Sequence, residues 1–428
     1  MLPAQDLYQK NKEGENMYDL NAVGKSAKQA SRELIKLSNE EKTRALLAIA
    51  DELIKNTDII LEENKKDLDS LSEEKSSFAD RLRLTKERIE QIAEGVRQVV
   101  SLPDPVGEIA DTVTRPNGLV ISRKRVPFGV IGIIFEARPN VCVDAAALCL
   151  KTSNACILRG GKEAINSNMI LAKIMRQALK NVGITEDAIC LVSDTSREIA
   201  TEMMRLNEYI DVLIPRGGAG LIKTVVNTAT VPVIETGTGN CHIYIEKTAD
   251  INMAADIVEN AKTSRVSVCN AAESLLVDED IAETVLPVIY ERLSKHNVEI
   301  FGCEKTQKIL NGINPATEED YKKEYLDYKI SVKIVNGVDE AIHHINENST
   351  QHSESIITKD EMCAAKFLNE VDSAAVYVNA STRFTDGFEY GFGAEIGIST
   401  QKLHARGPLG LRELTTLKFI IRGNGQIR

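Results

Sequence analysis

The chain has 428 residues, of which 43% are hydrophobic and 27% are charged, and these values favour a folded, soluble protein of more than one domain. The net charge of −11, the absence of tryptophan and an aromatic content of 4% argue against nucleic acids and membranes as partners. No stretch is long and apolar enough to suggest a transmembrane helix. Residues 1–16 are polar and lack the apolar core of a secretory signal, so we expect an N-terminal extension and a cytoplasmic protein.

The N-terminal third of the chain is predicted to be helical. Residues 38–56 open with a capping box formed by Ser38 and Glu41, and their apolar side chains recur on one helical face. Similar patterns predict further helices over about 58–70 and 85–100.

Residues 110–128 change to the alternating pattern of β-strands. Two alternating runs flank Pro116-Asn117-Gly118, which predicts a β-hairpin. The hairpin is long and charged, and two interpretations are open. It is either an arm that pairs with another subunit or an ordinary edge hairpin.

From Val130 onward, apolar strands alternate with amphipathic helices, and the alternation restarts after about residue 241. This pattern predicts two α/β domains, each with a parallel sheet that helices cover on both faces. Strands of the first domain are expected near 130–137, 155–161, 188–193, 211–217 and 231–237. Such sheets bind ligands at the carboxyl ends of their strands, and glycine-rich turns follow there at 159–161, 216–220 and 235–239.

The glycine-rich turns match neither standard nucleotide-binding fingerprint. Ile222 holds the position of the last glycine of a P-loop, and His242 holds that of the third glycine in G-x-G-x-x-G. Tight structural turns therefore remain the alternative to a phosphate-binding role.

Eight cysteines are spread along the chain without any Cys-x-x-Cys spacing, and only Cys241 has a histidine beside it. We therefore expect neither a metal site nor a disulfide scaffold. Cys269 raises the question of function, because buried reduced filler is the ordinary role of a cysteine in apolar surroundings.

Several segments in the same order give the chain a family resemblance. They are GVIGIIFEARPN, ILRGGKEAINSN, VPVIETGTGNCHIYI, SVCNAAESLLV and GPLGLRELTTLKFI. Together they resemble the gamma-glutamyl phosphate reductase family, the proline-pathway branch of the aldehyde dehydrogenase superfamily, from about residue 17 to the C-terminus. The resemblance implies two Rossmann-like parallel-sheet domains and a hairpin arm that forms homo-oligomers. We assign 17–106 and 127–240 to the cofactor-binding domain, 241–404 to the catalytic domain, and 107–126 and 405–428 to the oligomerisation arm.

The resemblance also implies the catalytic residues. Cys269 matches the nucleophile of the superfamily, and Asn140 matches the asparagine that donates to the oxyanion. Glu235 matches the general base. Its role stays open, because a reductase must keep water away from its thioester, whereas a hydrolytic relative activates water.

The cofactor positions differ from those of NAD-dependent relatives. Where many relatives have Lys-Pro-x-Glu, this chain has Arg159-Gly160-Gly161-Lys162. Bases attract a 2′-phosphate that a carboxylate would repel, so we expect NADPH; two solvated surface bases are the alternative. The remaining cofactor candidates are Gly217, Gly218 and Glu324, although Leu326 and Asp327 replace the Phe and Gly of the motif around Glu324.

The reaction implied by the resemblance is the reduction of L-glutamate 5-phosphate to L-glutamate 5-semialdehyde and phosphate through a cysteine thioester. Arg138, Arg265 and Arg406 are candidates for binding the substrate anions, or else form structural ion pairs. A contact with glutamate 5-kinase stays open. The alternatives are a CoA-acylating or hydrolytic, NAD-dependent aldehyde dehydrogenase and a non-catalytic protein that kept the fold.

Overall fold

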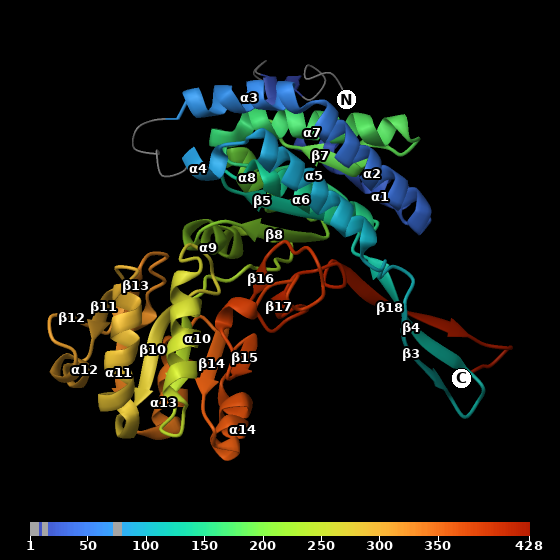
Figure 1. Ribbon diagram of the computed structural model, residues 1–428. Coiled ribbons are helices and arrows are strands. Elements are labelled where there is room, and N and C mark those ends of the chain that lie inside the picture. Colours follow the sequence, from blue (N-terminus) through green and yellow to red (C-terminus); the bar gives the residue numbers. More distant parts are fainter. Residues whose placement is uncertain (1–7, 11–15, 72–78) are drawn as a thin grey trace. The chain divides into compact units, whose positions relative to one another are not determined.

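The computed structural model describes residues 8–10, 16–71 and 79–428 (Figure 1). Of the polar extension expected over 1–16, only β1 (Tyr8–Lys10) and the first residue of β2 (Asn16–Tyr18) lie within the described residues, and these two strands pair antiparallel. Within the described residues, no helix combines the length and the apolar character needed to cross a membrane.

The chain forms two compact units. The first unit contains residues up to 235 together with 391–397 and 409–428, and the second contains 236–390 and 398–408. The sequence placed 391–397 in the catalytic domain, whereas the structure packs this segment within the first unit. Gly393 illustrates this packing. It lies so close to Leu102 of the first unit that a Cβ at Gly393 would be 2.5 Å from the Leu102 side chain, and its φ of +77° also favours glycine.

The first unit contains a four-stranded parallel sheet in the order β7-β6-β5-β8. Its strands are β5 (Val130–Phe135), β6 (Ala155–Arg159), β7 (Ile189–Leu191) and β8 (Val212–Arg216). Its helices are α1 (Leu20–Leu34), α2 (Asn39–Lys55), α3 (Thr57–Asp69), α4 (Ala79–Leu82), α5 (Lys86–Ser101), α6 (Pro139–Lys151), α7 (Ile165–Asn181), α8 (Arg197–Met203) and α9 (Ala219–Thr228).

The strand expected over 231–237 does not form. Only Val233 makes an isolated parallel bridge, to Leu213 of β8. Pro232 lacks the backbone N–H that a continuing ladder needs, so the segment cannot extend the sheet as a regular strand.

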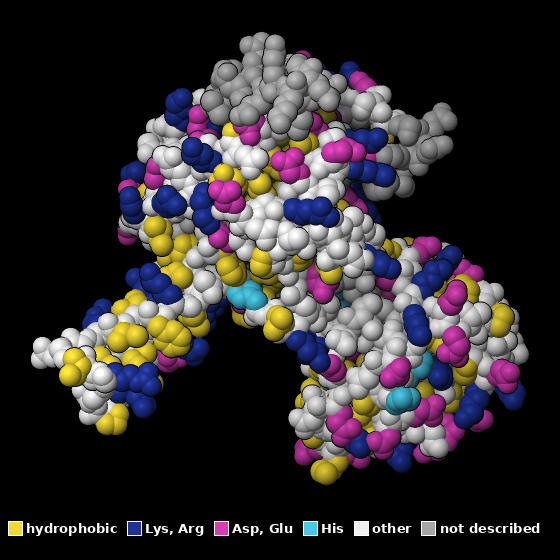
Figure 2. All heavy atoms as spheres, turned by 180° about the vertical axis from the view of Figure 1, so that it is seen from behind, with side chains coloured by type: hydrophobic (Ala, Val, Ile, Leu, Met, Phe, Trp, Pro, Cys, Tyr) yellow, Lys and Arg dark blue, Asp and Glu magenta, His cyan; other side chains and the backbone are white. Residues whose placement is uncertain are grey.

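The hairpin predicted around Pro116-Asn117-Gly118 is confirmed, and the C-terminal segment completes it. β3 (Ile109–Thr114) and β4 (Val120–Pro127) pair antiparallel, and β18 (Thr415–Arg422) pairs with the other edge of β4. Figure 2 shows hydrophobic side chains gathered on this three-stranded arm. The large hydrophobic side chains that are exposed on its strands are Ile109, Val113, Phe419 and Ile421.

The second unit contains a seven-stranded sheet in the order β12-β11-β13-β10-β9-β14-β15, with all neighbours parallel. Its strands are β9 (Cys241–Ile245), β10 (Ala272–Asp278), β11 (Glu299–Gly302), β12 (Asn314–Pro315), β13 (Lys329–Val335), β14 (Ser353–Ile357) and β15 (Ala375–Val378). Its helices are α10 (Ile251–Thr263), α11 (Glu279–Ser294), α12 (Glu304–Ile309), α13 (Gly337–Asn348) and α14 (Glu361–Glu370).

Two apolar cores cover the two faces of this second sheet. Ile243 and Ile245 of β9 join the core formed with α10 and α11. Tyr244, between them in the chain, joins the core formed with α13 and α14. Successive strand residues point to opposite faces, so a fully apolar strand is buried between two helical layers, as the sequence predicts.

Candidate active site

Cys269 lies in the segment that connects α10 to the amino end of β10. Its side chain is half-buried, and Asn270, which follows it, is buried. The backbone carbonyl of Cys269 accepts a hydrogen bond from the Sγ of Cys241 over 3.1 Å. The cysteine backbone is thus held from the side of β9.

The turn before β9 packs directly against the cysteine. A Cβ on Gly239 would lie 1.4 Å from the carbonyl oxygen of Cys269, so only glycine fits there. The N–H of Gly239 donates to Oε1 of Glu324 over 2.7 Å. Glu324, which the sequence assigned to the cofactor, therefore holds the turn that packs on the cysteine.

A third segment binds the cysteine loop through Asn270. The Nδ2 of Asn270 donates to the carbonyls of Arg383, over 3.3 Å, and Thr385, over 3.0 Å. The hydroxyl of Thr382 donates to the carbonyl of Asn270 over 2.8 Å. Three segments thus surround Cys269 through hydrogen bonds and close packing, namely residues 239–241, 264–270 and 382–385.

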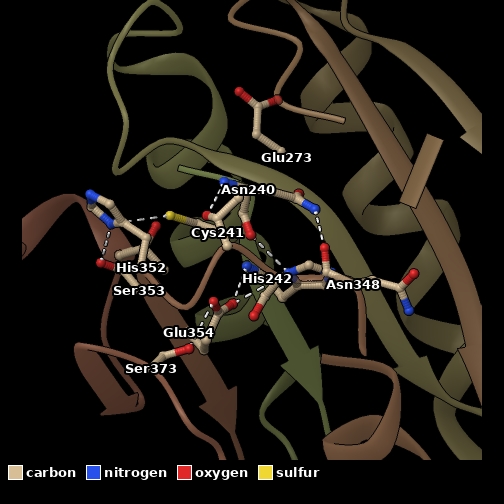
Figure 3. Close-up of polar contacts among 12 residues, drawn as sticks. Asn240, Cys241, His242, Glu273, Asn348, His352, Ser353, Glu354 and Ser373 are labelled. Carbon is tan, nitrogen blue, oxygen red and sulfur yellow. Dashed lines mark hydrogen bonds and ion pairs between the residues drawn. The ribbon is translucent and has the colours of Figure 1, made fainter. Parts of the chain in front are cut away.

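Cys241 belongs to a buried polar cluster, shown in Figure 3. Its sulfur lies 3.7 Å from Nδ1 of His352, which lies 2.8 Å from the hydroxyl of Ser353 (Figure 3). Burial raises the pKa of the Cys241 thiol well above its usual range, and nearby Glu354 acts in the same direction. Cys241 is therefore a neutral S–H donor and a positioning group, not a second nucleophile.

The other cysteines divide by environment. Burial raises the pKa of Cys142, and that of Cys190 to about 12, so these thiols are inert. Cys303 is half-buried at the start of α12. Burial alone would raise its pKa, but hydrogen bonds from the backbone and from Thr306 lower it on balance. Cys303 is thus the natural control for experiments on Cys269.

Apart from Glu324, which belongs to the second unit, the predicted cofactor residues lie at or just after the carboxyl ends of strands in the first unit. Arg159 ends β6, and its Nη2 donates to the carbonyls of Thr195, over 2.7 Å, and Ser196, over 3.2 Å. Burial lowers the pKa of its guanidinium. Its Nε is buried and has no hydrogen-bond partner among the described residues. Lys162 follows on the exposed surface.

Gly217 and Gly218 follow β8, which adjoins β5 where the strand order reverses. A Cβ on Gly217 would lie 2.7 Å from the carboxyl carbon of Glu136, and the N–H of Gly218 donates to that carboxylate over 3.1 Å. The sequence did not single out Glu136, although this residue ends the segment GVIGIIFE. Gly218 caps α9 with no side-chain hydrogen bond.

Asn140 and Glu235 also belong to the first unit, whereas Cys269 belongs to the second. Asn140 lies in the first turn of α6, and its Nδ2 donates to Asp144 over 3.0 Å. Burial raises the pKa of Asp144 to about 6, and the hydrogen bond from Asn140 partly offsets this effect. Glu235 is half-buried, at the end of the first unit's longest segment.

The three predicted substrate arginines have different surroundings. Arg406 pairs with Asp372 over 2.8 Å, and Lys402 binds the same carboxylate, as in a structural ion pair. Arg138 immediately precedes α6 in the first unit. Arg265 is exposed and lies in the segment that leads to Cys269. The sequence did not single out Arg383, because no motif marks it.

Comparison with known proteins agrees with this architecture. Residues 4–311 match the model of the aldehyde dehydrogenase family. A gamma-glutamyl phosphate reductase from Clostridium perfringens is 64% identical over 407 residues, which cover 95% of this chain and 98% of that protein. The crystal structure of the gamma-glutamyl phosphate reductase from Thermotoga maritima superposes with a TM-score of 0.94 at 50% identity, covering 96% of this chain and 99% of that one.

The chain therefore belongs to the aldehyde dehydrogenase family. An acetylating aldehyde dehydrogenase from Geobacillus thermoglucosidasius shares the fold, with a TM-score of 0.69 at 17% identity, covering 96% of this chain and 97% of that one. Within the family, the chain falls in the branch whose members carry the name gamma-glutamyl phosphate reductase.

Proposed function

We propose that the chain catalyses the NADPH-dependent reduction of L-glutamate 5-phosphate to L-glutamate 5-semialdehyde and phosphate, a step of proline biosynthesis. High identity to the named relatives over nearly the whole chain supports this reaction. The observation that carries the proposal is Cys269, a half-buried cysteine whose backbone is fixed by three segments. A thiol held in this way is suited to nucleophilic catalysis and is unlike core filler.

The thiolate of Cys269 attacks the acyl carbonyl carbon of the substrate. The bond from this carbon to the phosphate oxygen breaks, phosphate leaves with the electron pair, and a thioester remains. Asn140 and the backbone N–H of Cys269 are the proposed donors to the oxyanion, and losing one such donor costs about 2.7–4 kcal/mol of barrier. The Asn140 amide carries two hydrogens, so its bond to Asp144 leaves one for the substrate.

The residues of the first unit fit a phosphorylated dinucleotide. α9 begins at an N-terminus that Gly218 does not cap with a side chain, and such a helix start favours anions; in this structure the carboxylate of Glu136 accepts the N–H of Gly218 there. Arg159 and Lys162 supply positive charge suited to a 2′-phosphate, and the Nε of Arg159 is a buried donor that still lacks a partner among the described residues. Reduction of the thioester needs a hydride, which NADPH supplies when it is bound.

Glu235 serves in this proposal as a proton carrier or as a group that tunes the thiol, not as a base for water. Hydrolysis of the thioester would consume the activated substrate without forming the aldehyde. We also propose that the protein is cytoplasmic and forms a homo-oligomer. The exposed hydrophobic side chains of the arm support the oligomer. A contact with glutamate 5-kinase, which would protect the labile acyl phosphate, stays a prediction.

The reverse reaction tests the proposed function. NADPH formation from L-glutamate 5-semialdehyde and NADP⁺ is measured with phosphate, with coenzyme A, and with neither. We expect turnover only with phosphate and none in Cys269→Ser. Turnover with coenzyme A, or without any acyl acceptor, would instead indicate an acylating or a hydrolytic aldehyde dehydrogenase.

A further inference from the structure

Two arginines of the second unit lie beside the cysteine segment. Arg265 belongs to the segment itself, and Arg383 belongs to a short 3₁₀ helix (Thr382–Phe384). The Nε of Arg383 donates to the hydroxyl of Ser264 over 3.1 Å, and its carbonyl accepts from Asn270 over 3.3 Å. Arg383 is therefore attached to the chain on both sides of Cys269.

These two arginines differ from the other arginines of the second unit in their charge partners. Arg292 binds Asp256 and Glu259, and Arg406 binds Asp372. Within the part of the chain that the structure describes, neither Arg265 nor Arg383 forms an ion pair with a carboxylate. Nη1 and Nη2 of Arg383 likewise make no hydrogen bond to any described residue.

The local electrostatics disfavour the charged form of Arg383. Burial lowers the pKa of the Arg383 guanidinium, and the charge of Arg265 lowers it further. Asp386 and the thiol of Cys269 act in the opposite direction. The carboxylate of Asp386 accepts the N–H of Phe388 over 2.9 Å and forms no ion pair with Arg383. One arginine within the cysteine segment and one hydrogen-bonded to that segment, neither with a carboxylate pair, are suited to bind a multiply charged anion.

We propose that Arg383, together with Arg265, binds the phosphate group of the acyl-phosphate substrate and stabilises it as the leaving group. This assignment deepens the proposed function and rests on it. The phosphate oxygen is bonded directly to the carbon that Cys269 attacks, so the phosphate must lie beside the sulfur. The α-carboxylate of a glutamyl group is attached further along the carbon chain, where a different group must bind it.

Inorganic phosphate gives a test that does not depend on turnover. The rate at which iodoacetamide alkylates Cys269 is followed by peptide mass spectrometry at increasing phosphate and constant ionic strength, with Cys303 as the internal reference. The matched variants are Arg383→Gln, Arg383→Lys and Arg292→Gln. Arg292→Gln removes an arginine of the same unit that already binds carboxylates. Melting temperatures and the unprotected alkylation rates verify that each variant is folded.

We expect phosphate to protect Cys269 saturably in the wild type and in Arg292→Gln. In Arg383→Gln the phosphate concentration for half protection should rise about tenfold or more, because a charge-assisted bidentate contact is lost. Arg383→Lys should retain part of the affinity. An unchanged half-protection concentration in Arg383→Gln overturns the proposal, and so does Arg383-dependent protection by glutarate but not by phosphate.

The outcome separates this inference from the proposed function. If the wild type fails to turn over glutamate 5-semialdehyde while phosphate protection still depends on Arg383, the substrate assignment fails and the anion site stands. If turnover requires phosphate but Arg383→Gln keeps the wild-type KM for phosphate, the function stands and the assignment of Arg383 falls.

Discussion

The two units carry similar parallel sheets, but the residues proposed for function lie at opposite strand ends in the two. In the first unit, Arg159 is the last residue of β6 and Gly217 follows the carboxyl end of β8. In the second unit, Cys269 precedes the amino end of β10, and Cys241 is the first residue of β9. Ligands of open α/β sheets ordinarily bind at the carboxyl ends, so the rule describes the first unit and not the second.

The second unit departs from this rule because three loops, and not the sheet itself, build its candidate site. The turn at Gly239, the Cys269 segment and residues 382–385 fix one another by hydrogen bonds and close packing. A sheet therefore supplies a rigid platform at either end. Which end carries function depends on the loops that pack there.

The largest effect is expected from removing the proposed nucleophile of the second unit. Cys269→Ser should lower kcat by at least about a thousandfold, because a hydroxyl replaces the thiolate nucleophile. Binding of NADPH, measured by fluorescence, should stay within about twofold if the first unit holds the cofactor on its own. Cys303→Ser is the control and should keep wild-type activity. Near-normal turnover in Cys269→Ser would show that the second unit does not supply its nucleophile at Cys269.

The loop construction of the second unit predicts a large effect from a small substitution. Gly239→Ala places a Cβ on the Cys269 carbonyl and must displace the cysteine backbone. We expect kcat/KM to fall about 100-fold, which is the scale for a misplacement of about 1 Å. Gly95→Ala in α5 meets nothing within 4 Å and should be neutral or slightly stabilising. Equal activities in the two variants would show that this close contact does not position the nucleophile.

The first unit should instead control cofactor choice. Lys162→Glu places a carboxylate where we expect the 2′-phosphate, so the ratio of kcat/KM for NADPH over NADH should fall about tenfold or more. Lys162→Gln should show an intermediate ratio. Steady-state rates with both cofactors provide the measurement, and an unchanged ratio would assign the 2′-phosphate to other residues. The alkylation rate of Cys269 should not change in either variant.

The smallest expected effect is a pH dependence of stability that arises in the first unit. The pKa of Asp144 is raised to about 6, above the usual value of about 3.8. The folded state therefore favours the protonated acid, and this stability is lost as the pH rises from about 4 to about 6. Asp144→Asn should be more stable than the wild type by up to ~3 kcal/mol above about pH 7 and no more stable below about pH 4.

Urea unfolding of Asp144→Asn and the wild type across this pH range provides the measurement. Asp51→Asn serves as the control, because Asp51 is an exposed carboxylate of α2 in the same unit. A pH-independent difference between Asp144→Asn and the wild type would mean that Asp144 is charged in the folded protein.

Local sequence signals predicted most of the elements. The capping box of Ser38 and Glu41 is present as predicted, and the antiparallel hairpin forms around Gly118, which has a φ of +86°. The strand expected over 231–237 does not form, because Pro232 lacks the backbone N–H that a strand ladder needs, and an apolar pattern alone does not report this lack. Periodicity reports burial, whereas strand pairing also requires hydrogen-bond donors.

The sequence by itself determined the alternation of strands and helices, because apolar periodicity and turn residues act over a few positions. Through its resemblance it also identified Cys269 as the candidate nucleophile. Only the tertiary structure joined Cys241 and Arg383 to the cysteine segment, and Glu324 to the Gly239 turn that packs on it, from positions that are distant along the chain. Contacts between distant segments depend on how the strands order themselves in the sheet, and no local pattern encodes that order.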